Sequence, residues 1–292
     1  MRIVVTGSEG VIGQSLVPRL LAEGHQVLRF DKRISPVQCD VTSYVFVKSA
    51  FVAFNPDVVI HMAAQVGRIT GEEMPHTSVD SNMMGTLNVV LACIETGARL
   101  INFSTSEVYG HNSIFGTPDI LEQNGMYGLT KLAAEGIVKH YVSLGKLKAV
   151  SVRPFMVYGP HEVPNGVYRS AVSNFIDAAM NGSTFYAHNG CVRSWCFADD
   201  FVDGLMLLLD YEPDGYEAIS IGTDEYRSME ECGRIVLDVV GNGAMTVVDP
   251  PEFLVSCVKQ ADFSKIQSLG FSPKVSLEEG VKRTYAAFVG RK

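Results

Sequence analysis

Apolar runs alternate with amphipathic segments through the first half of the chain. The runs are rich in valine and isoleucine and lie at residues 2–5, 26–30, 57–64, 99–104 and 149–155. Apolar positions at helical spacing predict helices between them, over residues 11–22, 43–53, 79–96 and 127–144. Continuous apolar strands separated by helices are typical of a parallel sheet that is covered on both faces. The pattern therefore predicts a doubly wound α/β fold of the Rossmann type.

The alternation loosens after residue 158, where Pro, Gly, Asn and Asp mark frequent loops. Helical spacing predicts further helices near residues 170–181, 200–211, 228–240 and 277–289. We therefore assign residues 1–158 to the Rossmann domain. Residues 159–292 are expected to form mainly a smaller C-terminal α/β lobe that binds substrate, and some of their segments are expected to return to the Rossmann sheet.

Composition narrows the classes of protein. With 47% hydrophobic and 19% charged residues, the chain is globular rather than disordered. Its net charge of -8, without a run of Lys or Arg, argues against nucleic-acid binding. We expect a cytoplasmic protein, because no apolar run is long enough for a membrane span and the segment before the first glycine is too short for a signal peptide. The six cysteines form no CxxC pair and predict reduced thiols without a metal site.

A glycine-rich turn follows the first predicted strand. In "VVTGSEGVIG", Gly7, Gly10 and Gly13 stand between a strand and a helix, where backbone amides can approach a pyrophosphate. The second strand ends in Asp31, the position from which a carboxylate binds the adenosine ribose hydroxyls. Asp31 would repel a 2′-phosphate, which favours NAD over NADP, although two cations follow it directly. The other expected cofactor contacts are Val11, Ile12, Lys32, Asp40, Val41, Ala63 and Ala64.

Tyr127 and Lys131 are four residues apart and therefore share one face of a predicted helix. A lysine ammonium next to a phenol favours the phenolate, so a tyrosine, whose ordinary pKa is near 10, can act as a base close to neutral pH. Such a base removes a hydroxyl proton while the attached carbon gives hydride to NAD. Together with the dinucleotide turn, this pair predicts a redox active site in which both residues also contact the cofactor.

These motifs resemble the extended branch of the short-chain dehydrogenase/reductase superfamily, in particular the NAD-dependent epimerases and dehydratases of nucleotide sugars. The resemblance covers most of the chain and rests on "TGSEGVIG", Asp31, "HMAAQ", Asn82, "FSTSEVYG", "YGLTK", "VRPFMVYGP" and "VRSWCFADDFVDG". It implies bound NAD and a nucleotide-diphosphate sugar as substrate. It also implies a homodimer formed by the helices that contain residues 82–96 and 127–144.

The resemblance assigns roles around the sugar. It implies that Thr105 or Ser106 hydrogen-bonds the C4 oxygen beside the base Tyr127, and that Arg193 grips the diphosphate or lies near the sugar. Glu107 stands where 4,6-dehydratases and uronic-acid decarboxylases keep an acidic residue, whereas 4-epimerases more often have a small one. Because a 4-keto group acidifies C5, a carboxylate there can move a proton at C5. The alternative is that Glu107 caps a turn or pairs with a cation.

Several reactions remain open at this point. We expect oxidation of the hexose at C4 followed by dehydration at C5, with decarboxylation second and 4-epimerisation as the alternative. Two positions depart from the family pattern: Met156 replaces an Asn, and His161 replaces an Arg that is common in members acting on glucuronic acid, which argues against a uronic substrate. These departures leave a non-catalytic NAD-binding module as a lesser alternative, and a reductase of a non-sugar ketone is a further one.

Overall fold

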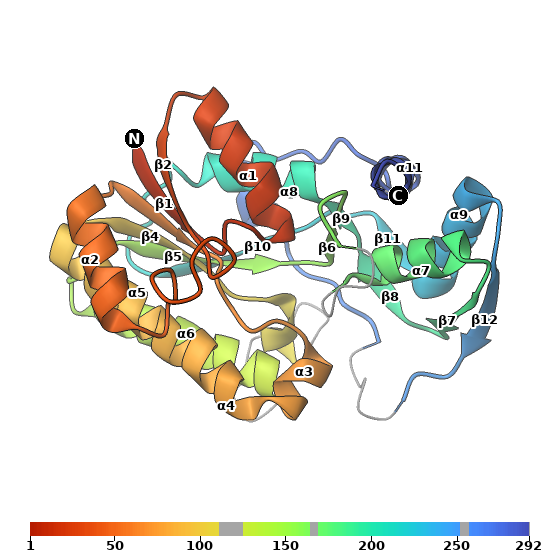
Figure 1. Ribbon diagram of the computed structural model, residues 1–292, viewed down its shortest axis with the longest axis horizontal. Helices are drawn as coiled ribbons and strands as arrows, with labels where there is room; N and C mark the ends of the chain where they lie inside the picture. The colour runs from red at the N-terminus through yellow and green to blue at the C-terminus, as the bar shows by residue number, and fades with distance from the viewer. Residues whose placement is uncertain (111–124, 164–168, 252–256, 292) are drawn as a thin grey trace.

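The computed structural model describes residues 1–110, 125–163, 169–251 and 257–291. Within these ranges, parallel strands form a six-stranded sheet in the order β10-β5-β4-β3-β1-β2 (Figure 1). In chain order the strands are β1 (Arg2–Thr6), β2 (Gln26–Phe30), β3 (Val58–His61), β4 (Arg99–Phe103), β5 (Ala149–Pro154) and β10 (Glu217–Ile221). The predicted doubly wound sheet is therefore confirmed. Edge strand β10 comes from the C-terminal part of the chain, and the apolar pattern did not single it out.

Helices cover both faces of this sheet (Figure 1). One face carries α1 (Val11–Ala22), α8 (Ala198–Leu207) and α10 (Ser264–Ser268), and the other carries α2 (Tyr44–Phe54), α5 (Gly85–Thr96) and α6 (Met126–Ser143). Alternate residues of β1 serve the two faces, since Ile3 and Val5 pack on the α1 side and Val4 packs on the α5 side. All three side chains are fully buried, and each burial stabilises the fold by about 1.5–3 kcal/mol.

Short helical segments connect β3 to α5. They are α3 (Arg68–Glu73), α4 (Pro75–Ser78) and the π-helical segment η1 (Val79–Met84), which runs directly into α5. The sequence predicted one α-helix over residues 79–96, and the structure replaces its first turn with the wider π-helical geometry. Such π-helical turns are frequent at functional sites. A second short segment, the 3-10 turn η2 (Ser106–Tyr109), follows β4.

The other described elements form the smaller C-terminal α/β lobe, on the right of Figure 1. They are β6 (Val157–Tyr158), α7 (Ala171–Met180), β7 (Thr184–His188), β8 (Val192–Ser194), β9 (Cys196–Phe197), β11 (Tyr226–Ser228), α9 (Met229–Val240), β12 (Ala244–Val248) and α11 (Leu277–Val289). Trp195 is buried in the core of this lobe and donates its indole N–H to the Arg227 carbonyl. In the described ranges, no helix is both long and apolar enough to cross a membrane.

Candidate active site

The glycine turn lies at the carboxyl end of β1, where the strand order reverses between β2 and β3. Doubly wound sheets bind nucleotides at such a switch point. Gly7 has a φ of 71°, and a Cβ atom there would lie 2.8 Å from the Ala63 backbone nitrogen. A Cβ atom at Gly13 would lie 2.5 Å from the Ser8 carbonyl oxygen. Both positions therefore require glycine, because a side chain at Gly7 would collide with the backbone after β3 and a side chain at Gly13 would collide with the turn itself.

Helix α1 begins directly after this turn. Gly10 is its N-terminal cap, and Val11 and Ile12 are its first residues. The first turn of α1, all of which is described, contains no acidic residue. Its free backbone N–H groups and the positive end of the helix dipole are therefore suited to an anion such as a pyrophosphate.

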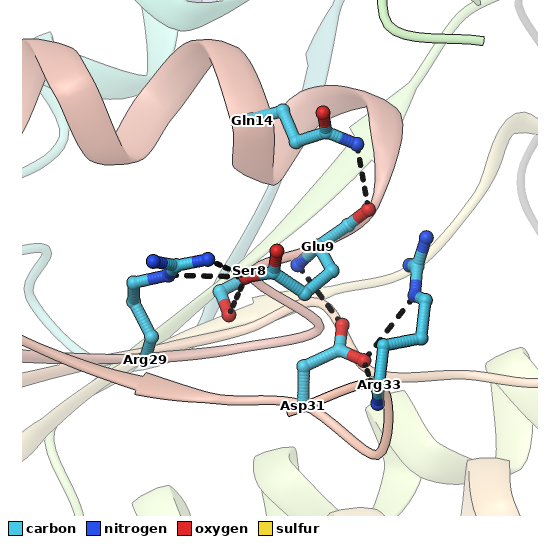
Figure 2. Close-up of polar contacts among 6 residues, drawn as sticks. All are labelled: Ser8, Glu9, Gln14, Arg29, Asp31 and Arg33. Atoms are coloured by element: carbon cyan, nitrogen blue, oxygen red, sulfur yellow. Dashed lines mark hydrogen bonds and ion pairs between the residues drawn. The ribbon is translucent and has the colours of Figure 1, made fainter. Parts of the chain in front are cut away.

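Asp31 follows β2 and faces the glycine turn (Figure 2). Its carboxylate accepts the backbone N–H of Glu9 at 3.0 Å and that of Arg33 at 2.9 Å. The Arg33 Nε atom lies 3.4 Å from the same carboxylate. The carboxylate expected to bind the adenosine ribose is thus fixed to the glycine turn itself.

The segment after Asp31 is also anchored. Lys32 and Asp40 form an ion pair of 2.9 Å. Val41 is buried, and its carbonyl accepts a hydrogen bond from the Asn88 amide at 2.9 Å. The cofactor candidates between residues 31 and 41 are therefore held to α5 as well as to β2.

Asn82, in η1, ties the loop after β3 to helix α6. Its Oδ1 atom accepts the Gln65 N–H at 2.8 Å, and its Nδ2 atom donates to the Gln65 carbonyl and the Thr130 hydroxyl, each at 3.0 Å. The half-buried Ala64 directly precedes Gln65, and Thr130 directly precedes Lys131. The π-helical segment thus fixes the end of β3 relative to the helix that carries the expected catalytic pair.

Tyr127 and Lys131 lie in the first two turns of α6, and both are buried. Glu72 of α3 accepts the Met126 N–H at 2.7 Å and so satisfies a free amide of α6 one residue before Tyr127. Burial lowers the pKa of Lys131 to about 8, although Glu135 opposes this shift. A lysine that is still mostly protonated at neutral pH therefore lies one helical turn from Tyr127.

Thr105, Ser106 and Glu107 lie at the carboxyl end of β4. Thr105 and Ser106 are buried, and the Thr105 hydroxyl accepts the Glu107 N–H at 3.2 Å. Segment η2, which begins at Ser106, packs against α6. The structure thus brings the residues expected at the sugar next to the helix of Tyr127 and Lys131.

Three cations surround the Glu107 carboxylate. Lys259 forms an ion pair with one carboxylate oxygen, and the Arg68 Nε atom lies 3.6 Å from the other. Arg193, on β8, is close enough to interact electrostatically with the same carboxylate. Burial alone would raise the pKa of Glu107, but Lys259 and Arg68 outweigh burial and hold the pKa at about 2. Glu107 is therefore ionised and paired with cations, which was the alternative interpretation of this residue.

Arg193 and Lys259 are held by the same part of the lobe. Arg193 is 7% exposed and donates to the carbonyls of Val192 and Cys257. The Lys259 backbone N–H donates to the Val192 carbonyl at 3.2 Å, and burial lowers the pKa of the Lys259 ammonium to about 8. Strand β8 and the segment around residue 258 therefore present both cations to Glu107.

Lys259 and Arg68 were not predicted from the sequence. Lys259 stands in "CVKQAD", which carries no chemical motif. Arg68 follows "HMAAQVG" at the start of α3, so its only signal was proximity to the end of β3. Both residues reach Glu107 through tertiary contacts that no spacing in the sequence indicates.

Met156 and His161, which depart from the family pattern, lie in different surroundings. Met156 has a φ of 38°, a conformation that Asn adopts more readily than Met. His161 interacts electrostatically with Arg291 and Asp199. The substitution at residue 156 therefore places an apolar side chain on a backbone geometry suited to Asn.

Comparison with known proteins identifies the family to which this chain is related. A sequence profile of the NAD dependent epimerase/dehydratase family matches residues 3–222. The chain belongs to this family. UDP-glucose 4-epimerase of Mycolicibacterium smegmatis is 29% identical, covering 99% of this chain and 98% of the relative. UDP-N-acetyl-alpha-D-glucosaminuronate decarboxylase of Bacillus cytotoxicus is 28% identical, covering 98% and 97%.

Solved structures of the epimerase/dehydratase family have the same fold. The UDP-glucose 4-epimerase of Thermus thermophilus in complex with NAD matches with a TM-score of 0.88 and 28% identity, covering 100% of both chains. As a member of this family, the chain is an enzyme that modifies nucleotide sugars and uses NAD. Its relatives include both 4-epimerases and decarboxylases, so membership does not select the reaction.

The described residues fit NAD. A Cβ atom at Gly7 or Gly13 would fill the narrow turn, and the start of α1 offers free N–H groups for a pyrophosphate. Asp31 offers a fixed carboxylate for ribose hydroxyls, and Lys131 offers a buried ammonium on α6. When bound, NAD takes a hydride from a substrate carbon and later returns it.

Proposed function

We propose that this enzyme oxidises a nucleotide-linked sugar at C4 and then alters it at C5, with decarboxylation of a uronate favoured over dehydration. The observation that carries this proposal is the buried group at the end of β4, where Glu107 meets three cations beside the helix of Tyr127. A sugar with its C4 oxygen at Thr105 and Ser106 has C5 as its next ring atom.

Tyr127 is the base of the first step. Its phenolate accepts the proton of the C4 hydroxyl, and the protonated Lys131 stabilises the phenolate. The hydroxyls of Thr105 and Ser106 hold the C4 oxygen in place. Glu72 and Asn82 support this arrangement, because they fix the start of α6 to α3 and to the loop after β3.

The second step favours decarboxylation because Glu107 is a weak base. A carboxylate with a pKa near 2, paired with Lys259 and Arg68, removes the C5 proton poorly, and dehydration requires that removal. Decarboxylation does not require it. The C5–C6 bond of a 4-keto uronate breaks, CO2 leaves, and the electron pair forms an enolate across C4 and C5. A proton then adds at C5, and reduction at C4 gives a nucleotide-linked pentose.

A 4-epimerase is the second candidate. The Mycolicibacterium relative carries that activity, and the ion pairs of Glu107 are also compatible with a purely structural carboxylate. In that case the 4-keto sugar rotates within the site and is reduced at C4 on its other face, with no change at C5.

We also propose that two copies of the chain form a homodimer through α5 and α6. The two helices pack against each other on the same face of the sheet, and two-fold symmetry would join them to their copies. Light scattering at micromolar concentration should give twice the mass of the chain. A monomer would contradict this assembly.

Incubation with a panel of nucleotide sugars tests the reaction. UDP-glucuronate, UDP-glucose and dTDP-glucose are each added to enzyme with NAD, and the products are identified by mass spectrometry. A decarboxylase releases CO2 and yields a pentose from the first, while a dehydratase yields a 4-keto-6-deoxy sugar from one of the others. An isomer of unchanged mass indicates an epimerase.

A further inference from the structure

Three cations lie within two residues of Asp31, the carboxylate expected to bind the adenosine ribose. Arg29 is on β2, and Lys32 and Arg33 directly follow Asp31. Their side chains are 50%, 56% and 59% exposed. A cation near this carboxylate is the usual means of accommodating the 2′-phosphate that distinguishes NADP from NAD. The charges around Asp31 therefore do not by themselves explain a preference for NAD.

Two of these cations pair with carboxylates of their own loop. The Arg33 Nε atom lies 3.4 Å from the Asp31 carboxylate, and the Lys32 ammonium lies 2.9 Å from Asp40. A 2′-phosphate that binds either cation must compete with the carboxylate already beside it. Both pairs connect residues 31–40 to each other and leave the glycine turn out.

Arg29 instead pairs with the glycine turn. Its Nε and Nη2 atoms both donate to one carboxylate oxygen of Glu9, at 3.0 and 2.5 Å (Figure 2). The Ser8 hydroxyl donates to the same oxygen at 3.0 Å. Guanidinium groups bind phosphates through such paired N–H donors. The Glu9 carboxylate therefore occupies donors of Arg29 that are suited to a phosphate.

The backbone of Glu9 is fixed to the ribose carboxylate. Its N–H donates to Asp31 at 3.0 Å, and its carbonyl accepts the Gln14 side-chain amide at 2.9 Å (Figure 2). Glu9 thus joins the glycine turn to α1 and to the end of β2. A phosphate brought to Asp31 would meet a junction that carries two carboxylates, one of which already holds Arg29.

We propose that Glu9 is a specificity residue for NAD, which disfavours NADP by occupying Arg29, the cation that would otherwise bind the 2′-phosphate. Asp31 repels that phosphate directly, and Glu9 withdraws the attraction that would offset the repulsion. Glu9 has this role whichever reaction follows at the sugar, because the Glu9–Arg29 pair lies at the cofactor end of the site.

Calorimetric titration of the NAD-free protein with NAD and with NADP tests the role of Glu9. Glu9→Ala removes the carboxylate and keeps the backbone N–H that donates to Asp31. We expect NADP to bind about 10-fold more tightly than to the wild type, the low end for one charge-assisted hydrogen bond because Arg29 is half exposed. NAD affinity should change by less than about 3-fold, since NAD has no 2′-phosphate.

Glu23→Ala is the matched control. Glu23 pairs with Arg19 at 2.6 Å at the far end of α1, and the Arg19 side chain is 50% exposed, like that of Arg29. The control removes the same negative charge from an equally exposed arginine, and both affinities should stay within about 2-fold of the wild type. An equal gain in NADP affinity in Glu9→Ala and Glu23→Ala would assign the effect to net charge and overturn the proposal.

The double variant Glu9→Ala/Arg29→Ala identifies the cation. Removing Arg29 should cancel the gain in NADP affinity. A gain that persists without Arg29 would show that Glu9 acts by direct repulsion, and an unchanged ratio of NADP to NAD affinity in Glu9→Ala would make the pair structural. Either result overturns the proposal. Glu9→Gln keeps the shape of the side chain and should shift the ratio in the same direction if Glu9→Ala unfolds the turn.

Discussion

The cofactor end and the sugar end of this site are built in different ways. At the cofactor end, Gly7 and Gly13 lie between β1 and β2, Asp31 directly follows β2, and backbone geometry defines their roles. At the sugar end, Glu107 meets Arg68 and Lys259 from distant parts of the chain. A short stretch of sequence therefore predicts the cofactor, whereas the chemistry at the sugar depends on side chains that only the fold brings together.

The Tyr127→Phe variant should impair the chemistry at the sugar end while leaving NAD binding at the cofactor end intact. The ring still packs in α6 while the proton acceptor is lost, so turnover should fall by about a hundred- to ten-thousand-fold. NAD affinity should stay within about 3-fold of the wild type, because the glycine turn and Asp31 are untouched. Steady-state rates and NAD titration measure both quantities. Wild-type turnover in this variant would remove Tyr127 from its role as base.

Glu107→Gln tests the sugar end alone. Removing one partner of a buried ion pair leaves Lys259 and Arg68 facing each other, which should cost about 3–5 kcal/mol in the free energy of unfolding. Urea unfolding of the NAD-free protein measures this difference. NAD affinity of the folded variant should not change.

The pH dependence of the stability difference between wild type and Glu107→Gln shows whether the charge of Glu107 causes that difference. The pKa of Glu107 is lower in the folded protein than its ordinary value of 4.5, so the carboxylate stabilises the fold above about pH 4.5. That stabilisation is lost as the pH falls towards about 2. The difference in stability between wild type and variant should therefore shrink over this range. A difference that stays constant with pH would show that the charge of Glu107 is not its cause.

Gly7→Ala tests the cofactor end with a matched control. Gly7 and Gly24 both have positive φ, 71° and 81°, but a Cβ atom at Gly24 meets nothing within 4 Å. Gly24→Ala should cost about 1 kcal/mol in the free energy of unfolding, from backbone strain alone. Gly7→Ala should cost about 1–3 kcal/mol more and weaken NAD binding, because its Cβ atom collides with the Ala63 backbone. Equal costs in thermal unfolding would contradict the close packing.

The smallest expected effect concerns Lys131, which links the two ends. Burial lowers its pKa to about 8, so the ammonium is lost as the pH rises above that value. We expect kcat/KM to fall about tenfold for each pH unit above 8, since the phenolate of Tyr127 then loses its cation. In Lys131→Met this alkaline decline should be absent from the residual activity. A decline that persists in the variant belongs to another group.

Most of the sheet could be predicted from the sequence because β1, β3, β4 and β5 are largely buried on both faces and read as apolar runs. Strand β10, "EAISI", begins with a carboxylate and sits at the edge of the sheet, so it gave a weaker signal. The π-helical start of the helix at residues 79–84 could not be predicted, because the hydrogen bonds of Asn82 to Gln65 and Thr130 are tertiary contacts.

The candidate site was predictable to the same degree. The glycine turn, Asp31 and the Tyr127–Lys131 spacing depend on local geometry. In the structure the glycine turn and Asp31 lie at the switch point of the sheet, and Tyr127 and Lys131 lie one turn apart at the start of α6. The charge state of Glu107 depends on Lys259, a residue 152 positions away in the chain. Sequence alone therefore favoured dehydration, and the ion pairs shift the proposal towards decarboxylation.

The reaction of the enzyme with UDP-glucuronate in deuterium oxide tests the central claim most directly. Mass spectrometry and proton NMR of the product report both the loss of carbon and the exchange at C5. A 4-keto uronate that loses CO2 must take a proton from solvent, so the proposal predicts a nucleotide-linked pentose with deuterium at C5. An isomer of the uronate with unchanged mass and no deuterium at C5 would contradict it.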